Sequence, residues 1–296
     1  MAISRQWFAG AAARRWTDRL IVGLGLLGFG NGRRLAHLSF AMVLIGYAVA
    51  FRTRSAGDIP PSLLPAVFAA FSALLYGGIY VLNDIVDLAH DRQHPVKQKR
   101  LVASGRISVS LATASALALI FIGLAASFLL SPLLGGFACL FLAVNLLYTL
   151  GLKRLRYVDL AINTLTYPLR TLLGIVLAGG APAAHLPVVL GVGVLAWTET
   201  TLRRHYELTH AGTVGRPVLR RYRPRVLLWA ALLPGFAWPV LFAYRGSTLE
   251  TAILSLGLFL WLLIFGVWLA ETQEVFRQAP RARSALGWLA LYVLGR

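Results

Sequence analysis

The chain has 296 residues, of which 58% are hydrophobic and 14% charged, and its formal net charge at pH 7 is +18. Its mean hydropathy of +0.70 excludes a soluble globular protein and predicts an integral membrane protein. The single cysteine, Cys139, excludes an intrachain disulfide. Because it lies in an apolar run, we expect it to be a small buried hydrophobe.

The first 34 residues carry scattered arginines and glycines and lack the pattern of a cleaved signal peptide. Within them, Leu20–Phe29 is too short to cross a bilayer, so we expect it to lie at the membrane interface or to cap a helical bundle. We predict a cytoplasmic or interfacial segment over residues 1–34 and a single transmembrane domain over 35–296.

Eight apolar runs are long enough to cross a hydrocarbon core of about 30 Å. They are Leu35–Phe51, Ser62–Leu82, Ser108–Leu130, Pro132–Leu150, Tyr157–Gly179, Leu186–Leu202, Val226–Tyr244 and Leu249–Ala270, and a shorter ninth run covers Ser284–Leu294. The predicted fold class is therefore all-α, a polytopic membrane bundle of about nine transmembrane helices.

The basic residues are distributed unevenly between the two sides of these helices. If the N-terminus is cytoplasmic, 24 of the 29 Lys and Arg residues lie in inner segments and 4 in outer segments, while Arg170 lies within a span. This bias predicts the orientation by the positive-inside rule. It also explains most of the charge without nucleic acid as a partner. We expect a protein of the cell inner membrane (the plasma membrane) whose polar site faces the cytoplasm.

The stretch Asn83–Arg100 carries the strongest functional signal, because it holds Asp84, Asp87 and Asp91, three of only 11 acidic residues. If the preceding helix continues past Asn83, then Asn83, Asp87 and Asp91 recur at i, i+4 and i+8 with Asp84 beside them. Carboxylates this close repel one another unless a hard divalent cation bridges them, often with a substrate phosphate. The predicted metal ligands are Asn83, Asp84, Asp87 and Asp91, and the expected cofactor is Mg²⁺.

A cationic cluster of Lys97, Lys99 and Arg100 follows the aspartates directly. A metal site beside such a cluster suits a diphosphate ester, whose charge needs neutralisation in binding and in departure. The simpler alternative is a solvated loop with incidental charges, and the membrane setting favours the metal site.

Ionisable groups within spans are costly, so each is a candidate for function. In the span Tyr157–Gly179, four polar residues share one helix face: Asp159, Asn163, Tyr167 and Arg170. We interpret this face as a polar wall of a substrate chamber, in which Arg170 binds a phosphate or holds Asp159. The alternative is an internal Arg–Asp pair bridged by other groups.

The cytoplasmic end of the next span is also polar. Glu199, Arg203 and Glu207 share a face there, with Arg204 beside them. They form either a ladder of salt bridges or a second anion or metal subsite. The loop that follows holds five more arginines, namely Arg216, Arg220, Arg221, Arg223 and Arg225. Lipid headgroups account for such runs, and some of these arginines are candidates for holding a phosphate.

Three blocks of the chain, in this order, resemble the UbiA superfamily of membrane prenyltransferases, and within it the branch typified by decaprenyl-phosphate phosphoribosyltransferase. The first block is Asn83-Asp84-x-x-Asp87-x-x-x-Asp91, continued by Arg92-x-His94-Pro95-x-Lys97-x-x-Arg100. The second runs from Tyr148 to Lys153, with Asp159 and Arg170 downstream. The third is Arg203-Arg204 with Glu207, and then Arg216 to Tyr222.

The resemblance covers nearly the whole chain and implies a UbiA-like catalytic domain over residues 35–296. It implies magnesium-dependent transfer of a 5-phosphoribosyl group from 5-phosphoribosyl 1-diphosphate to a polyprenyl phosphate, releasing diphosphate, for synthesis of a cell-envelope pentose donor. Leu101 and His205 depart from the branch, which commonly has proline and tyrosine there. The D-x-x-x-D motif of the aromatic prenyltransferases is absent from Arg203–Arg225, which favours the phosphoribosyl branch.

Roles follow for the residues of these blocks. The expected catalytic residues are Asp84, Asp87, Asp91 and Asp159, the last of which would stabilise positive charge on the ribose. The expected substrate-binding residues are Asn83, Lys97, Arg100, Tyr148, Lys153, Asn163, Arg170, Arg203, Arg204, Glu207, Arg220 and Arg221. The isoprenoid tail is expected to enter sideways from the lipid bilayer.

Two alternatives stay open. A UbiA-type enzyme could instead move a prenyl group from a prenyl diphosphate to an aromatic or other acceptor. A transporter or channel for phosphorylated anions would have to explain three aspartates at a basic opening, since these repel anions unless a metal is bound. The sequence favours no particular polyprenyl length or oligomeric state.

Overall fold

The computed structural model describes residues 22–27, 39–51, 59–93, 97–210, 217–244 and 246–272, and it has no strand within these ranges. Seven helical stretches there are long and apolar enough to cross a membrane, namely Pro61–Val86, Val109–Leu130, Pro132–Leu150, Val158–Leu177, Pro182–Thr209, Pro224–Ala243 and Thr248–Trp268. Each coincides with a predicted run, which confirms the all-α membrane bundle. The first run is described only as α2 (Ala41–Phe51), and the ninth lies outside the described residues. The count of nine and the orientation therefore stay predictions.

The chain divides into two compact units, one of Met1–Phe40 with Ile59–Thr149 and the other of Ala41–Asp58 with Leu150–Arg296. The predicted boundary between residues 34 and 35 stays a prediction.

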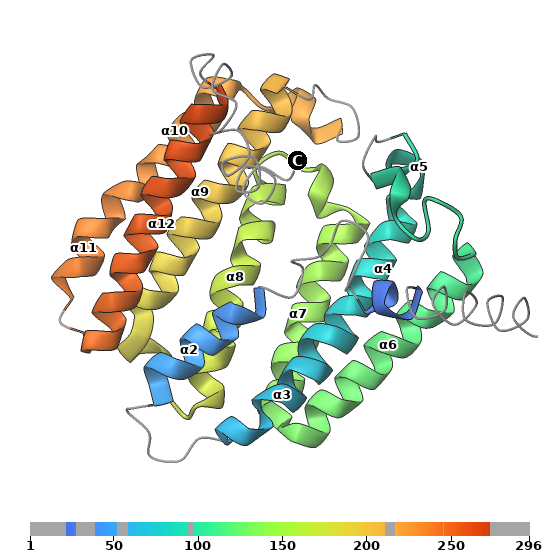
Figure 1. The fold of residues 1–296 in the computed structure, drawn as a ribbon, viewed down its shortest axis with the longest axis horizontal. Helices are drawn as coiled ribbons and strands as arrows, with labels where there is room; N and C mark the ends of the chain where they lie inside the picture. Colours follow the sequence, from blue (N-terminus) through green and yellow to red (C-terminus); the bar gives the residue numbers. More distant parts are fainter. Residues whose placement is uncertain are drawn as a thin grey trace, which may run out of the picture. The chain divides into compact units, whose positions relative to one another are not determined.

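The first unit contains α3 (Leu64–Val67), α4 (Gly77–Val86), α6 (Val109–Leu130) and α7 (Pro132–Leu150), which Figure 1 shows in blue to green. Between α3 and α4, residues Phe68–Tyr76 form a π-helix, a rare conformation that is frequent at functional sites. Helices α4 and α6 pack closely. A Cβ on Gly78 would lie 2.8 Å from the carbonyl oxygen of Ala116. A short helix, α5 (Leu88–Asp91), follows α4.

The loop after α5 is anchored in the core of the first unit. Its second described part starts with the 3-10 turn Lys97–Lys99, and Leu101 and Val102 are then buried against Val81. Residues 22–26 are helical, and Val22 packs against the same cluster. The backbone on the C-terminal side of the loop is thereby fixed.

Within its described residues, the second unit has six α-helices, with α2 beside α8 in Figure 1. The other five are α8 (Val158–Leu177), α9 (Leu186–His210), α10 (Pro224–Leu232), α11 (Ala237–Ala243) and α12 (Thr248–Thr272). A Cβ on Gly46 or Gly174 would lie 1.9 Å from a carbonyl oxygen of the facing helix. Lipid provides no hydrophobic force between helices, so close backbone packing through glycine supplies much of the association.

Pro234 divides one span of the second unit into α10, the 3-10 turn Leu233–Phe236 and α11. Because proline lacks an N–H, it cannot donate to the Ala230 carbonyl four residues earlier. The Trp197 indole N–H donates to that carbonyl at 2.7 Å, and the Thr198 hydroxyl donates to the next one at 3.2 Å. These substitute donors allow an interrupted helix in a bilayer.

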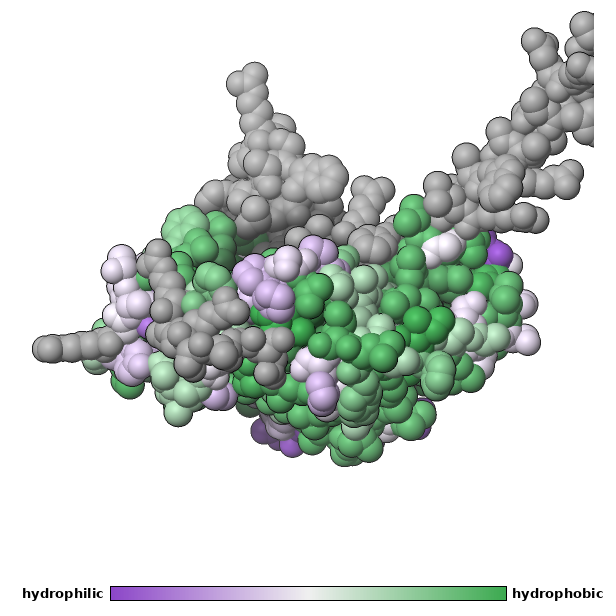
Figure 2. Space-filling view, turned by 90° about the horizontal axis from the view of Figure 1, so that it is seen from below, coloured by the Kyte–Doolittle hydropathy of each residue, from purple (hydrophilic) through white to green (hydrophobic). Residues whose placement is uncertain are grey.

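The helix surfaces are apolar, as contact with lipid requires. Phe121, Leu129, Phe236 and Val240 are each more than 70% exposed. Hydrophobic residues, in green, cover much of the face shown in Figure 2. Cys139 is also exposed on α7, so the prediction of a buried cysteine is wrong. A thiol is apolar enough to face lipid as readily as a protein core.

Candidate functional site

The predicted metal ligands lie in the first unit, where α4 ends and α5 begins. Helical hydrogen bonds continue through this junction, from the Asp87 N–H to the Asn83 carbonyl (2.9 Å) and from the Asp91 N–H to the Asp87 carbonyl (2.8 Å). Asp87 itself departs from helical geometry, with φ −90° and ψ 3°. The predicted i, i+4, i+8 face is therefore interrupted at its middle residue.

Arg100 contacts two of the three aspartates. Its Nη1 donates to Oδ1 of Asp84 at 2.9 Å and to Oδ2 of Asp91 at 2.7 Å. The side chains of Asp84 and Asp91 are 11% and 3% exposed, and that of Arg100 is 24% exposed. The structure thus brings together two buried carboxylates that are seven residues apart, with one arginine between them.

Helix α7 fixes the amide at the start of the motif, because the Thr149 hydroxyl donates to the side-chain oxygen of Asn83. Tyr148, the residue before Thr149, is half-buried. On the N-terminal side of Asn83, the rings of Tyr76 and Tyr80 lie 4.2 Å apart.

The donor set fits a hard divalent cation in part. Two buried carboxylate oxygens converge on one positively charged nitrogen, and oxygen is the ligand that Mg²⁺ prefers. Within the described ranges, no group of three or more His, Cys, Asp and Glu side chains is placed to hold a metal ion. The convergent pair is therefore Asp84 and Asp91, and Asp87 is not gathered with it.

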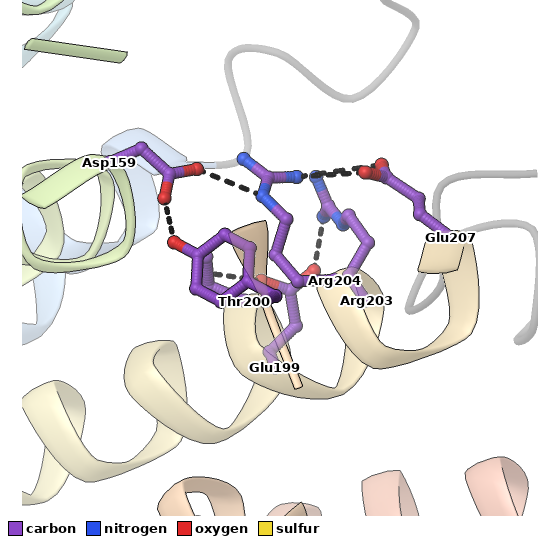
Figure 3. A network of polar contacts seen from close by, with 7 residues as sticks. Asp159, Glu199, Thr200, Arg203, Arg204 and Glu207 are labelled. Carbon is purple, nitrogen blue, oxygen red and sulfur yellow. Dashed lines mark hydrogen bonds and ion pairs between the residues drawn. The ribbon is translucent and has the colours of Figure 1, made fainter. Parts of the chain in front are cut away.

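A second polar network lies in the second unit, between the start of α8 and the end of α9 (Figure 3). Asp159 accepts from Arg204 Nε at 3.1 Å through Oδ2 and from the Tyr222 hydroxyl through Oδ1. Arg204 Nη1 also donates to Glu207 at 3.2 Å. Asp159 and Arg204 are 0% and 1% exposed. They form a buried ion pair in which both carboxylate oxygens of Asp159 are engaged.

Tyr222 was missed as a site residue. Its hydroxyl donates to Asp159 and accepts from the backbone N–H of Tyr157 at 2.9 Å. Burial, and then the hydrogen bond to Asp159, raises the pKa of Tyr222, so the phenol stays neutral. Tyr157 has φ +66°, which is uncommon for a residue other than glycine. Tyr222 closes the arginine-rich block, but no local pattern connects it with an aspartate 63 residues earlier.

Some of the other polar residues of α8 and α9 have partners that differ from those predicted. Arg203 pairs with Glu199, as a salt-bridge ladder predicts, whereas Glu207 pairs with Arg204. Arg170 is buried and donates to the Thr166 carbonyl at 2.9 Å, and Asp159 is held by Arg204 and Tyr222 instead. Asn163 is half-buried on the same helix.

Two basic loops of the second unit are hydrogen-bonded to each other. Arg156 Nη1 donates to the Arg221 carbonyl at 3.0 Å, and Arg221 Nη1 donates to the Arg154 carbonyl at 3.5 Å. Lys153 is half-buried in the first loop, and Arg220 is exposed in the second. Residues 151–156 and 217–225 contain no acidic residue. The adjoining cationic loops form a surface suited to phosphate groups.

The fold defines a polytopic membrane protein with two clusters of charged side chains, one in each unit. The chain belongs to the UbiA prenyltransferase family, whose model matches residues 39–290. It is therefore an integral membrane enzyme of the UbiA superfamily.

Decaprenyl-phosphate phosphoribosyltransferases are among the similar proteins. That of Corynebacterium glutamicum is 29% identical over 192 residues, 62% of this chain and 57% of that protein. That of Mycobacterium tuberculosis is 33% identical over 113 residues, 38% of this chain and 37% of that protein. The chain thus spans about a third to somewhat over half of the length of the curated relatives that it matches. A UbiA homolog from Archaeoglobus fulgidus bound to GPP and Mg²⁺ shares the fold, with a TM-score of 0.66 and 19% identity over 92% of this chain and 96% of that one.

Proposed function

We propose that the chain transfers the 5-phosphoribosyl group of 5-phosphoribosyl 1-diphosphate to a polyprenyl phosphate and releases diphosphate. The observation that carries the proposal is the convergence of Asp84 and Asp91 beside a basic loop. The relatives named decaprenyl-phosphate phosphoribosyltransferase support this choice of donor and acceptor. The bias of basic residues supports a site on the cytoplasmic side of the plasma membrane.

Residues of the first unit would bind the donor diphosphate. Asp84 and Asp91, with Asp87 and Asn83 beside them, would hold Mg²⁺. When bound, this cation neutralises charge that builds on the departing diphosphate. Lys97 and Arg100 compensate the remaining negative charge of the same group.

Bond exchange at the anomeric carbon needs no general base, because the acceptor phosphate is already an anion. Its oxygen forms the new bond to the anomeric carbon, and the bond to the diphosphate oxygen breaks. In the second unit, Lys153, Arg220 and Arg221 offer a cationic surface for a phosphate of either substrate. Since both oxygens of Asp159 are engaged, we assign it the positioning of α8 and the Pro217–Arg221 turn rather than contact with ribose.

Prenyl transfer is the second candidate function. The family description and the GPP and Mg²⁺ in the A. fulgidus structure favour it, and an aspartate site for a diphosphate would serve either donor. Membership of an enzyme family sets aside the transporter alternative.

A transfer assay distinguishes the two reactions. The purified protein in detergent is given Mg²⁺, radiolabelled 5-phosphoribosyl 1-diphosphate and a polyprenyl phosphate, and label in the organic phase is measured. We expect transfer, with a loss of about 100-fold in folded Asp84→Asn and Asp91→Asn variants. Arg106→Gln, at an exposed position of the same loop, is the matched control and should retain activity.

Two results would reject the proposal. Full magnesium-dependent activity in the folded aspartate variants would reject the site. Activity only with a prenyl diphosphate and an aromatic acceptor would agree with membership of the superfamily but would show that the proposed donor is wrong.

A further inference from the structure

We propose that Arg100 and the divalent cation compete for the same two carboxylates. The Arg100 guanidinium is the counter-ion of Asp84 and Asp91 in the metal-free protein, and it leaves them when the metal binds. The identity of the site as a metal site rests on the proposed function. The competition itself does not depend on which diphosphate is the donor.

The charges of this cluster provide the first argument. Asp84 and Asp91 are 11% and 3% exposed, and both burial and mutual repulsion disfavour two ionised carboxylates. A single nitrogen, Arg100 Nη1, donates to both carboxylates and lies between them. A divalent cation at this point supplies twice the charge. The metal would bind the same two carboxylate oxygens that now accept hydrogen bonds from Nη1. The guanidinium and the metal therefore exclude one another.

The backbone around Arg100 provides the second argument. The Arg100 N–H donates to the Lys97 carbonyl at 2.9 Å, and the Arg100 carbonyl accepts from the Ser104 N–H at 2.8 Å. The next residues, Leu101 and Val102, are 6% and 3% exposed within the apolar cluster of the first unit. The side chain, in contrast, is 24% exposed. Release therefore needs only rotation about the side-chain bonds of Arg100, while its Cα stays in place.

The exchange has a consequence for substrate binding. In the metal-free protein the Arg100 charge is engaged with carboxylates. Metal binding frees this guanidinium next to the metal, where in the proposed function it pairs with the donor diphosphate. The exchange predicts two effects of the metal on diphosphate binding. The metal binds the diphosphate itself, and it also releases the Arg100 guanidinium to pair with it.

Binding of Mn²⁺ alone to the full-length protein in detergent, measured by electron paramagnetic resonance, tests the competition. Arg100→Gln should bind Mn²⁺ about tenfold more tightly than the wild type, because no internal cation has to be displaced. Without metal this variant should have a lower Tm, and Mg²⁺ should raise its Tm by more than that of the wild type. Arg106→Gln should match the wild type in both measurements. Equal or weaker Mn²⁺ binding by Arg100→Gln overturns the proposal.

A second measurement uses the wild type and does not depend on folding of the variant. Phenylglyoxal modifies accessible guanidinium groups, and mass spectrometry reports the rate at each arginine. Mg²⁺ should accelerate modification of Arg100 and leave that of Arg106 unchanged. A rate at Arg100 that is unchanged or reduced by Mg²⁺ overturns the exchange.

The outcomes separate this inference from the proposed function. If the competition fails and magnesium-dependent transfer persists, the reaction stands and Arg100 has another role. If neither the wild type nor Arg100→Gln binds Mn²⁺ at millimolar concentration, the metal site and the competition are both wrong.

Discussion

The chain uses one type of contact, aspartate with arginine, in two different settings. In the first unit Asp91 and Arg100 are 3% and 24% exposed, and in the second unit Asp159 and Arg204 are both 1% exposed at the side chain. The Arg100 side chain is partly exposed and contacts two carboxylates. Arg204 has no such exposure and also contacts Glu207. Exposure of the arginine distinguishes a contact that a ligand can replace from one that fixes the fold.

The surroundings of Asp159 are also more fixed than those of Asp91. Asp159 lies in the first turn of α8, and Tyr222 donates to its second carboxylate oxygen. Negative charge is favoured near a helix N-terminus, so Asp159 has three sources of stabilisation in place. Asp91 lies in a four-residue helix after a distorted junction. The first unit thus holds its carboxylates for exchange, and the second holds its carboxylate for structure.

Removal of the Arg204 charge should have the largest effect. Arg204→Gln leaves Asp159 as a buried charge, and the free energy of unfolding should fall by about 3–5 kcal/mol. Chemical unfolding in detergent measures this loss. Mg²⁺ should not restore the variant, in contrast to Arg100→Gln. Asp159→Asn combined with Arg204→Met should recover more than half of the loss, because neither charge then remains. A loss below about 1 kcal/mol in Arg204→Gln would contradict the fixed role of this pair.

Tyr222→Phe tests the second contact of Asp159. It removes one donor to the carboxylate and the acceptor of the Tyr157 N–H, and we expect a loss of about 1–2 kcal/mol in the free energy of unfolding. Tyr148→Phe is the matched control, because the Tyr148 ring is half-buried and its stability effect should stay below about 0.5 kcal/mol. Equal effects of the two variants would show that the Tyr222 hydroxyl has no special structural role.

The raised pKa of Tyr222 gives a pH-dependent form of the same test. The folded protein holds this proton more tightly than the unfolded chain, whose tyrosine titrates near pH 10. The contribution of Tyr222 is therefore complete below about pH 10 and decreases above it, by at most about 1.4 kcal/mol per pH unit. The difference in Tm between wild type and Tyr222→Phe should be constant from pH 7 to 9 and decrease above pH 10. A difference that grows above pH 10 would contradict the direction of the shift.

The transmembrane spans were predictable because they depend on local composition. Runs such as Ser108–Leu130 are apolar over their whole length, and length alone identifies them. The pairing of Arg203 with Glu199 was predictable for the same reason, since helical spacing brings residues i and i+4 together.

Contacts that depend on packing between distant segments were not predictable. Arg170 was the arginine expected to hold Asp159, whereas Arg204, from the neighbouring helix α9, contacts it in the structure. Tyr222 reaches Asp159 from a loop 63 residues away. Asp84 and Asp91 are seven residues apart, a spacing that places both on one helix face, but the sequence does not show that Arg100 contacts both of them. A periodic pattern specifies a face of a helix, but only the tertiary structure specifies which side chain lies against it.

The smallest expected effect concerns Arg203, which adjoins Arg204 in sequence but pairs with Glu199 along the same helix. The side chains of Arg203 and Glu199 are 28% and 18% exposed, so water screens part of their interaction. Arg203→Gln should lower the free energy of unfolding by less than about 1 kcal/mol, against the several kcal/mol expected for the adjacent arginine. Parallel chemical unfolding of the two glutamine variants measures this difference. Because both substitutions remove one positive charge from the same turn of α9, the net charge and its general effect on stability cancel in the comparison. Similar losses of unfolding free energy in the two variants would mean that burial does not distinguish the neighbouring arginines. The distinction between exchangeable and fixed aspartate–arginine pairs would then be wrong as well.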